Sequence, residues 1–201
     1  MTAKIKLNAA SGGGSFSLQA PSSSANNRVM TLPDSADGTI LTTTNPKAGN
    51  IIQVVSAENT AVQSYSGTSQ YHTAMSINIT PSATSSKIFV CFNMNIGVNS
   101  TGAGTGAKIL RGSTDILIGD ADGSRTRGQV AQFTCHSNTT NTTRFITPSY
   151  LDSPNTTSQV TYNFQVYCSS QTIFINRSGE DVNSAGNVRG ASFAYAMEVA
   201  A

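Results

Sequence analysis

The chain has 201 residues, of which 38% are hydrophobic and only 11% charged, with a formal net charge of +2. This balance supplies enough apolar side chains for one core and disfavours charge-driven disorder. It also disfavours a nucleic-acid binder, which would cluster Lys and Arg along the phosphate backbone. We find no run of roughly 20 apolar residues that would insert into a membrane. The start lacks the apolar run of a secretory signal, so we expect synthesis and folding in a cytosol.

Residues 11–42 contain three short apolar runs, each bounded by Gly, Pro or Ser. Their apolar side chains are too few to offset the entropy of ordering roughly thirty residues at about 1–2 kcal/mol each. The segment is therefore disordered alone or shares its apolar face with identical copies. We predict that residues 1–48 form a self-associating extension that ends in a linker. The candidate self-association residues here are Phe16, Leu18, Val29, Met30, Leu32 and Ile40.

From residue 51 onward, apolar and polar residues alternate as in half-buried strands, and no window keeps helical spacing. About a dozen short strands separated by turn signals are typical of an antiparallel β-sandwich or jelly roll, here over residues 49–201. The fold class predicted for the whole chain is all-β. We predict strands at Ile51–Val55, Gln63–Tyr65, Met75–Ile79, Lys87–Ile96, Lys108–Leu110, Asp115–Ile118, Gln129–Cys135, Arg144–Ile146, Ser149–Leu151, Gln159–Tyr167, Thr172–Ile175 and Ser192–Val199.

The last predicted strand has two contrasting faces. One face carries Phe193, Tyr195, Met197 and Val199, and the other carries Ser192, Ala194, Ala196 and Glu198. We expect the large residues to supply core side chains, whereas the small ones allow a sheet or a neighbouring subunit to approach closely. Either face is a candidate for the axis of a trimer. We place the large residues among the self-association candidates.

The three cysteines, Cys91, Cys135 and Cys168, lie far apart in strand-like runs. An odd count at wide spacing does not indicate a disulfide framework. We interpret them as reduced thiols in the core.

Two loops resemble parts of known ligand loops. The glycine-rich stretch Gly102–Lys108 lacks the Gly-Lys-Ser/Thr sequence and the following helix of a phosphate-binding loop. Asp115, Asp120 and Asp122 match part of a calcium loop, but no Glu follows at its twelfth position. We favour an ordinary loop and an Asp-Gly turn, and we predict neither a cofactor nor a metal.

Only two histidines are present, His72 and His136. His136 follows Cys135 directly, and adjacent residues of a strand point to opposite faces, so the pair is poorly placed to chelate one ion. A trimer could still gather one His from each chain. No nucleophile, base and carboxylate set for catalysis is evident, so we predict that the protein is not an enzyme.

Two phrases, KLNAASGGGSFSLQAP at residues 6–21 and NNRVMTLPDSADGTIL at 26–41, resemble the N-terminal module of tail-fibre and virion-surface proteins of marine bacteriophages, cyanophages included. The phrases IIQVVSAENT and SFAYAMEV resemble the knob domain that accompanies it. The resemblance implies a homotrimeric structural protein on the virion surface, of the capsid-decoration or short-fibre type. Its N-terminal segment would dock on capsid or tail proteins, and its knob would be a jelly roll of the C1q or tumour-necrosis-factor type.

Two alternatives remain open. In the first, the protein is a tail-fibre adhesin whose exposed loops bind host cell-surface polysaccharide, with tyrosines in place of the absent Trp. In the second, it is a C1q-like module that binds other proteins, although such modules usually carry a secretory signal. The candidate recognition residues are Asn99, Thr101, Thr105, His136, Asn138 and Asn141.

Overall fold

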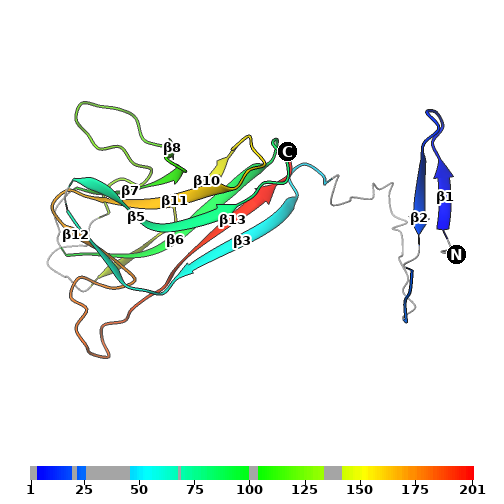
Figure 1. The fold of residues 1–201 in the computed structure, drawn as a ribbon. Helices are drawn as coiled ribbons and strands as arrows, with labels where there is room; N and C mark the ends of the chain where they lie inside the picture. The colour runs from blue at the N-terminus through cyan, green and yellow to red at the C-terminus, as the bar shows by residue number, and fades with distance from the viewer. Residues whose placement is uncertain (1–3, 20–21, 26–45, 68, 100–103, 134–141) are drawn as a thin grey trace, which may run out of the picture. The chain divides into compact units, whose positions relative to one another are not determined.

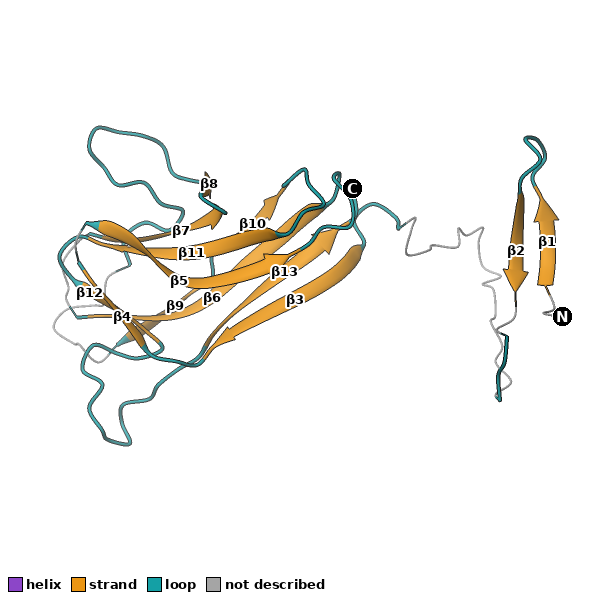
Figure 2. Cartoon of the chain, in the orientation of Figure 1, coloured by secondary structure: helices purple, strands orange, loops and turns teal. Residues whose placement is uncertain are grey.

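The computed structural model describes residues 4–19, 22–25, 46–67, 69–99, 104–133 and 142–201. The chain divides into two compact units, Met1–Ile40 and Leu41–Ala201 (Figure 1). Every regular element in the described residues is a β-strand (Figure 2), so the all-β prediction is confirmed. The domain boundary predicted after residue 48 stays a prediction.

The first unit contains a hairpin of β1 (Lys4–Asn8) and β2 (Ser15–Gln19). Ile5 pairs with Leu18, and Leu7 lies two residues further along β1, so these three side chains share one face of the hairpin. They are 64%, 40% and 60% exposed, in that order. An isolated two-stranded hairpin is marginally stable in water. Strand β2 matches the predicted run at Phe16 and Leu18, whereas β1 was not predicted.

The second unit is a sandwich of two antiparallel sheets. The larger sheet consists of β3 (Ile51–Asn59), β4 (Gln63–Ser66), β6 (Lys87–Val98), β9 (Thr143–Ile146), β10 (Ser149–Asp152), β12 (Thr172–Ile175) and β13 (Ser192–Val199). The smaller sheet consists of β5 (Gln70–Ile79), β7 (Thr105–Arg111), β8 (Thr114–Ile116) and β11 (Val160–Cys168).

In the larger sheet, short strands lie end to end beside the long strand β6. Strand β12 ends with Ile175 opposite Ile96, and β13 begins pairing with β6 at Phe193 opposite Asn93, so both run along one edge of β6. Strands β9 and β10 follow each other along its other edge, and β3 and β4 do the same beside β13 and β12.

Each of these end-to-end pairs occupies a single strand position. In chain order the larger sheet then reads 1-8-3-6 and the smaller sheet 2-7-4-5. This is the order of a jelly roll, which is built from two Greek keys. The predicted jelly roll is therefore confirmed.

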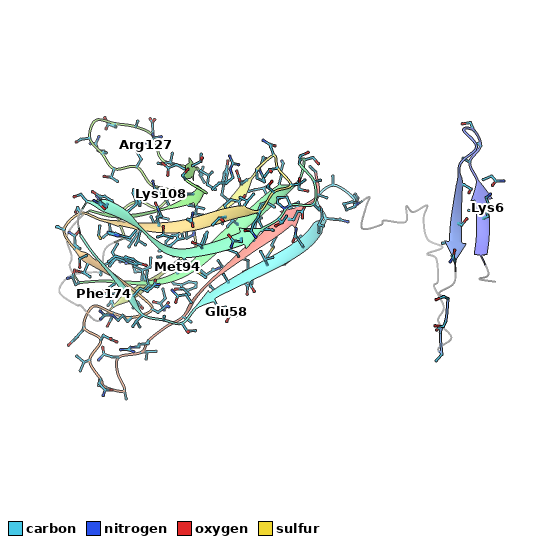
Figure 3. The ribbon with its side chains drawn as sticks, in the orientation of Figure 1. Lys6, Glu58, Met94, Lys108, Arg127 and Phe174 are labelled. Carbon is cyan, nitrogen blue, oxygen red and sulfur yellow. The ribbon has the colours of Figure 1, made fainter. Side chains whose placement is uncertain are left out.

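The core lies between the two sheets. Alternate residues of β6 from Ile88 to Val98 point inward and are at most 1% exposed. Phe92 of β6 packs against Phe164 of β11, with ring centroids 5.6 Å apart. Met94, which is labelled in Figure 3, is another of these inward residues of β6. Burying an aliphatic or aromatic side chain of this size contributes about 1.5–3 kcal/mol, so this interface is the main source of stability.

The cysteines occupy different environments. Cys168 is fully buried, in agreement with the prediction of a core thiol. Cys91 is only half-buried, because it lies at an outward position of β6. Cys135 lies outside the described residues.

Strand β13 corrects one prediction. Its small face is the buried one: Ala194, Ala196 and Glu198 are inaccessible to solvent, whereas Phe193 and Tyr195 point away from the core. The physical reason is space, because β13 lies directly beside β6, whose large inward side chains already fill the layer between the sheets.

The strand predicted at Gln129–Cys135 is a second correction. In its described part, only Val130 forms a bridge, to Ala107 of β7. The amides of Gln129 and Val130 both donate to the Ala107 carbonyl, at 2.9 Å each, which is incompatible with the regular spacing of a ladder. From Gln129 to Phe133 the chain is a loop that contacts β7 through this bridge and through the Phe133 carbonyl.

Asn176 closes the break between β12 and β13. It is fully buried with a left-handed φ of 65°, and its Nδ2 donates to the carbonyls of Asn59 at 2.7 Å and Ala61 at 2.9 Å. Its Oδ1 accepts a 2.6 Å hydrogen bond from the Ser192 hydroxyl, which in turn accepts one from the Asn95 amide at 3.0 Å. One side chain thus connects the chain on both sides of the break.

We expect Asn176→Ala to lower the free energy of unfolding by about 2–4 kcal/mol, because it leaves several buried polar groups without partners. Denaturant unfolding measures this change. Asn187→Ala, which removes an exposed hydrogen bond to Ser184, is the control and should cost less than about 0.5 kcal/mol. Equal stability of Asn176→Ala and the unchanged protein would contradict the role given to Asn176.

Glu198 is a buried carboxylate near the end of β13. Its Oε1 accepts hydrogen bonds from the amide and hydroxyl of Ser82, at 2.7 and 2.6 Å, and its Oε2 accepts one from Gln53 Nε2 at 2.6 Å. Burial by itself raises the pKa of Glu198, but the hydrogen bonds from Ser82, Ser86 and Gln53 together outweigh it and leave the pKa below its ordinary value. The charged form therefore holds the loop after β5 to the end of β13.

A lowered pKa in the folded state means that ionised Glu198 stabilises the protein at neutral pH and stops doing so as the pH falls through that pKa. As the pH falls below about 4.3, the ordinary pKa of Glu, we expect the free energy of unfolding of the unchanged protein to decrease more steeply than that of Glu198→Gln. Unfolding curves from neutral to acidic pH test this. A gap between the two proteins that is constant with pH would contradict it.

Candidate functional site

The outward surface of the larger sheet carries a row of apolar residues across four adjacent strands. Val54 of β3 pairs with Met197 of β13, Met197 pairs with Phe89 of β6, and Phe89 pairs with Leu151 of β10. Val54 is 53% exposed and Leu151 is 45% exposed. Because register partners point to the same side of a sheet, these side chains form one continuous strip.

A second row lies beside the first. Ser56, Tyr195, Cys91 and Ser149 are register partners across the same four strands. Neither row contains a charged residue. The rings of Tyr195 and Phe193 pack edge to face, with centroids 5.5 Å apart.

Further apolar residues extend this surface at both ends. Phe145 of β9 lies next to Phe193, with ring centroids 6.3 Å apart, and Ile51 pairs with Val199 at the opposite end. A hollow of about 210 Å³ beside Phe193 and Tyr195 is bounded by Ser56 and Glu58. We call the whole surface the outer face; its apolar members are Ile51, Val54, Phe89, Phe145, Leu151, Phe193, Tyr195, Met197 and Val199.

The outer face has the chemistry of a protein interface. Contiguous apolar patches on single soluble chains are usually small, and larger ones mark contacts with other proteins. Aromatic and Met side chains surrounded by small polar residues are typical of the buried centre of such contacts. The hollow next to Tyr195 could receive a side chain of an opposing surface.

The sequence identified only part of this surface. Phe193, Tyr195, Met197 and Val199 lie together on it, as one strand face must. Its other members come from four strands, and register, which a single sequence does not reveal, brings them together. The members that sequence reasoning missed are Ile51, Val54, Phe89, Phe145 and Leu151.

In the first unit, Leu18 is exposed on the hairpin, where the structure adds Ile5 and Leu7, which the sequence analysis missed. Phe16 is a residue of β2. The remaining self-association candidates, Val29, Met30, Leu32 and Ile40, lie outside the described residues.

Two of the candidate recognition residues, Asn99 and Thr105, lie in the described part of the chain. Asn99 follows β6 and accepts a 2.8 Å hydrogen bond from the Thr172 amide through its Oδ1. Thr105, expected on an exposed loop, is instead 4% exposed, because it begins β7 and its hydroxyl donates to the Phe133 carbonyl at 2.8 Å. The other four, Thr101, His136, Asn138 and Asn141, lie outside the described residues.

The loops that resemble ligand loops have local partners. After Gly104 the chain continues as β7, whereas a phosphate-binding loop requires a helix at that point. Asp115 pairs with Lys108 at 2.7 Å, and Asp122 pairs with Arg125. In the part of the chain that the structure describes, no three His, Cys, Asp or Glu residues are grouped to hold a metal ion. The same residues include no helix of a length and apolarity suited to crossing a membrane.

Comparison with known proteins adds little beyond the fold. No protein family matches the sequence. No curated protein matches it either. The geometry itself defines the class: a jelly-roll protein with an exposed apolar sheet face.

Solved structures with some likeness include a mutant VP2 protein of infectious bursal disease virus in derived T=1 particles, at 14% identity and a TM-score of 0.42 over 94% of this chain. Another is the Gt strain of the same virus, at 13% identity and a TM-score of 0.41 over 94%. A third is dimeric latent PorU from Porphyromonas gingivalis, at 11% identity and a TM-score of 0.42 over 74%. The match covers 46% of each viral chain and 13% of PorU, and at these scores the likeness supports no functional argument.

Proposed function

We propose that this chain is a structural protein on the outer surface of a bacteriophage particle. In this proposal it is a homotrimer that docks through its N-terminal segment on capsid or tail proteins and projects the jelly-roll knob. The observation that carries the proposal is the outer face, a multi-strand apolar surface that a single chain leaves exposed. Its burial between copies would give the knob its oligomeric interface.

The hairpin supports the docking part of the proposal. Its two strands present Ile5, Leu7 and Leu18 on one side, while Lys4 and Lys6 occupy the alternate positions of β1. A hairpin this small needs to bury such a face against another surface to become stable. Copies of itself or a virion protein would both provide that surface.

The knob also has a clear proximal end. The Gly49 amide donates to the Ala200 carbonyl at 2.8 Å, and the Ala200 amide donates to the Asn50 carbonyl at 2.9 Å. The chain that comes from the first unit therefore enters the sandwich beside the C-terminus. The last residues of β4 and β6 lie at the other end, where a docked knob would meet its surroundings.

The bacteriophage assignment and the trimeric state rest on the sequence resemblance of residues 6–21 and 26–41. The structure contributes the apolar surfaces that such an assembly requires. The two lines of reasoning are independent, so each can be tested separately.

We expect the chain to have about three times its 20.9 kDa mass in light scattering on a sizing column. Val54→Asp together with Leu151→Asp should shift it to smaller species at micromolar concentration, because a charge on the outer face would lose its hydration in the interface. Both positions are about half exposed, so the fold itself should tolerate the changes.

The matched control is Val188→Asp, which places the same charge at an 80% exposed position of the loop after β12. It should leave the mass unchanged. A folded monomer of the unchanged chain would refute self-association, and an undiminished mass for the double variant would refute the role of the outer face.

The virion part of the proposal predicts that this chain is present in purified particles of the phage that encodes it. Quantitative mass spectrometry of dissociated particles should find it in multiples of three per attachment site. Its absence from intact particles would overturn the proposal, whatever the oligomeric state of the isolated protein.

A further inference from the structure

A groove of about 570 Å³ lies on the opposite side of the sandwich, against the outward surface of the smaller sheet. Its floor includes Tyr71 of β5, Tyr167 of β11 and Gly106 of β7, which form one row across three adjacent strands. Its wall is the loop after β8, and Figure 1 shows this loop arching away from the sheet. The loop residues that line the groove are Gly119, Asp120, Arg125, Thr126, Arg127, Gly128, Val130, Ala131 and Gln132. The volume lies within the usual range for small-molecule sites, roughly 300–1,000 Å³.

The aromatic floor exists because of a bulge in β5. The register with β11 shifts at Ala74, so that Phe164 pairs with Met75 but Gln165 pairs with Thr73. The shift places Tyr71 outward, beside Tyr167, with ring centroids 5.2 Å apart. Bulges commonly re-aim side chains next to binding sites.

Tyr71 is held firmly in this floor. Lys108 Nζ lies 4.2 Å from the centroid of the Tyr71 ring (Lys108 and Arg127 are labelled in Figure 3), and the Tyr71 hydroxyl donates to the Arg127 carbonyl. Burial, with smaller contributions from Asp115 and Tyr167, raises the pKa of Tyr71 to about 12, so this hydroxyl remains a donor at neutral pH. Tyr167 is the half-exposed ring that lines the groove beside it.

The wall is shaped to approach the sheet closely. A Cβ on Gly128 would come within 2.8 Å of the Ala107 carbonyl and 3.1 Å of the Tyr71 hydroxyl, so only glycine fits there without a shift. Arg127 Nε donates to the Gly119 carbonyl at 2.6 Å, which joins the two sides of the loop. The groove is thus formed by specific contacts within the knob.

The groove offers both donors and acceptors but little net charge. Lys108 pairs with Asp115, and Arg125 pairs with Asp122. Among the charged residues that line the groove, Arg127 and Asp120 have no ion-pair partner within the described part of the chain, and their charges are opposite in sign. Thr126 and Gln132 add neutral polar groups to the lining.

We infer that this groove binds a neutral saccharide. The C–H face of a pyranose ring stacks on an aromatic ring such as Tyr167, and its hydroxyls can both accept from the Arg127 guanidinium and donate to the Asp120 carboxylate. A charged ligand would gain less binding free energy, because one of the two unpaired groove charges would attract it and the other would repel it. The lining of this groove includes Thr105, one of the residues that the sequence suggested for recognition, and the site does not depend on the proposed trimer.

The test is saturation-transfer NMR of the full chain with the methyl glycosides of glucose, galactose and mannose, and with methyl glucuronide as the anionic probe. We expect at least one neutral glycoside to show saturable binding with a Kd of about 1–10 mM, as is usual for a single sugar ring in a shallow site. Tyr167→Ala should weaken it about tenfold, whereas Tyr167→Phe, which keeps the ring, should change it less than about twofold.

Two further variants separate binding from folding and from self-association. Arg127→Gln changes an exposed side chain of the loop and also removes its hydrogen bond to the Gly119 carbonyl; it should weaken binding severalfold and lower the unfolding midpoint only slightly. Tyr195→Ala removes the same type of ring from the outer face and should leave glycoside binding unchanged. The saccharide site is refuted if no neutral glycoside saturates below about 50 mM, if methyl glucuronide binds more tightly, or if Tyr167→Ala and Arg127→Gln both bind normally. The oligomeric mass measured in parallel keeps this outcome separate from that of the proposed assembly.

Discussion

The architecture depends on keeping the larger sheet continuous where three of its four strand positions are interrupted at the same level. Only β6 runs through the whole sheet, and its inward side chains are the middle of the core. Asn176 connects the strands across this interruption through its side chain. Its Nδ2 donates to the backbone carbonyls of Asn59 and Ala61, at and just after the end of β3, and its Oδ1 accepts a hydrogen bond from Ser192 at the start of β13. Its left-handed φ is one that Asn adopts more readily than most residues.

The two surfaces of the sandwich are suited to different tasks. On the larger sheet, uncharged rows across β3, β13, β6 and β10 favour contact with a protein surface. On the smaller sheet, a row of two tyrosines and a glycine lies under a polar loop, which favours contact with a small polar molecule. Because the sheets are opposite layers of one core, self-association through the first surface would leave the second accessible.

The sequence predicted what depends on local patterning. Alternation identified the all-β class, most strands and the jelly roll, and Phe193 and Tyr195 correctly marked one strand face. It assigned that face to the core, because nothing in the sequence of β13 shows that its neighbour β6 already fills the space between the sheets. It could not find the partners Val54 and Leu151, which depend on register. Nor could it place Tyr71 beside Tyr167, because alternation counted from Met75 gives the wrong side of β5 once a bulge intervenes.

The end-to-end arrangement of β12 and β13 has a consequence for how such a knob can diversify. The two strands continue one line along β6, and the Gly190 amide closes the base of the intervening segment on the Asn176 carbonyl at 2.9 Å. Residues between these anchors carry no part of the sheet's register, and the entropic cost of a longer loop grows only slowly with its length. Evolution or an engineer can therefore exchange the exposed part of this segment, residues 182–186, for a longer peptide and display it from a sandwich that remains the same.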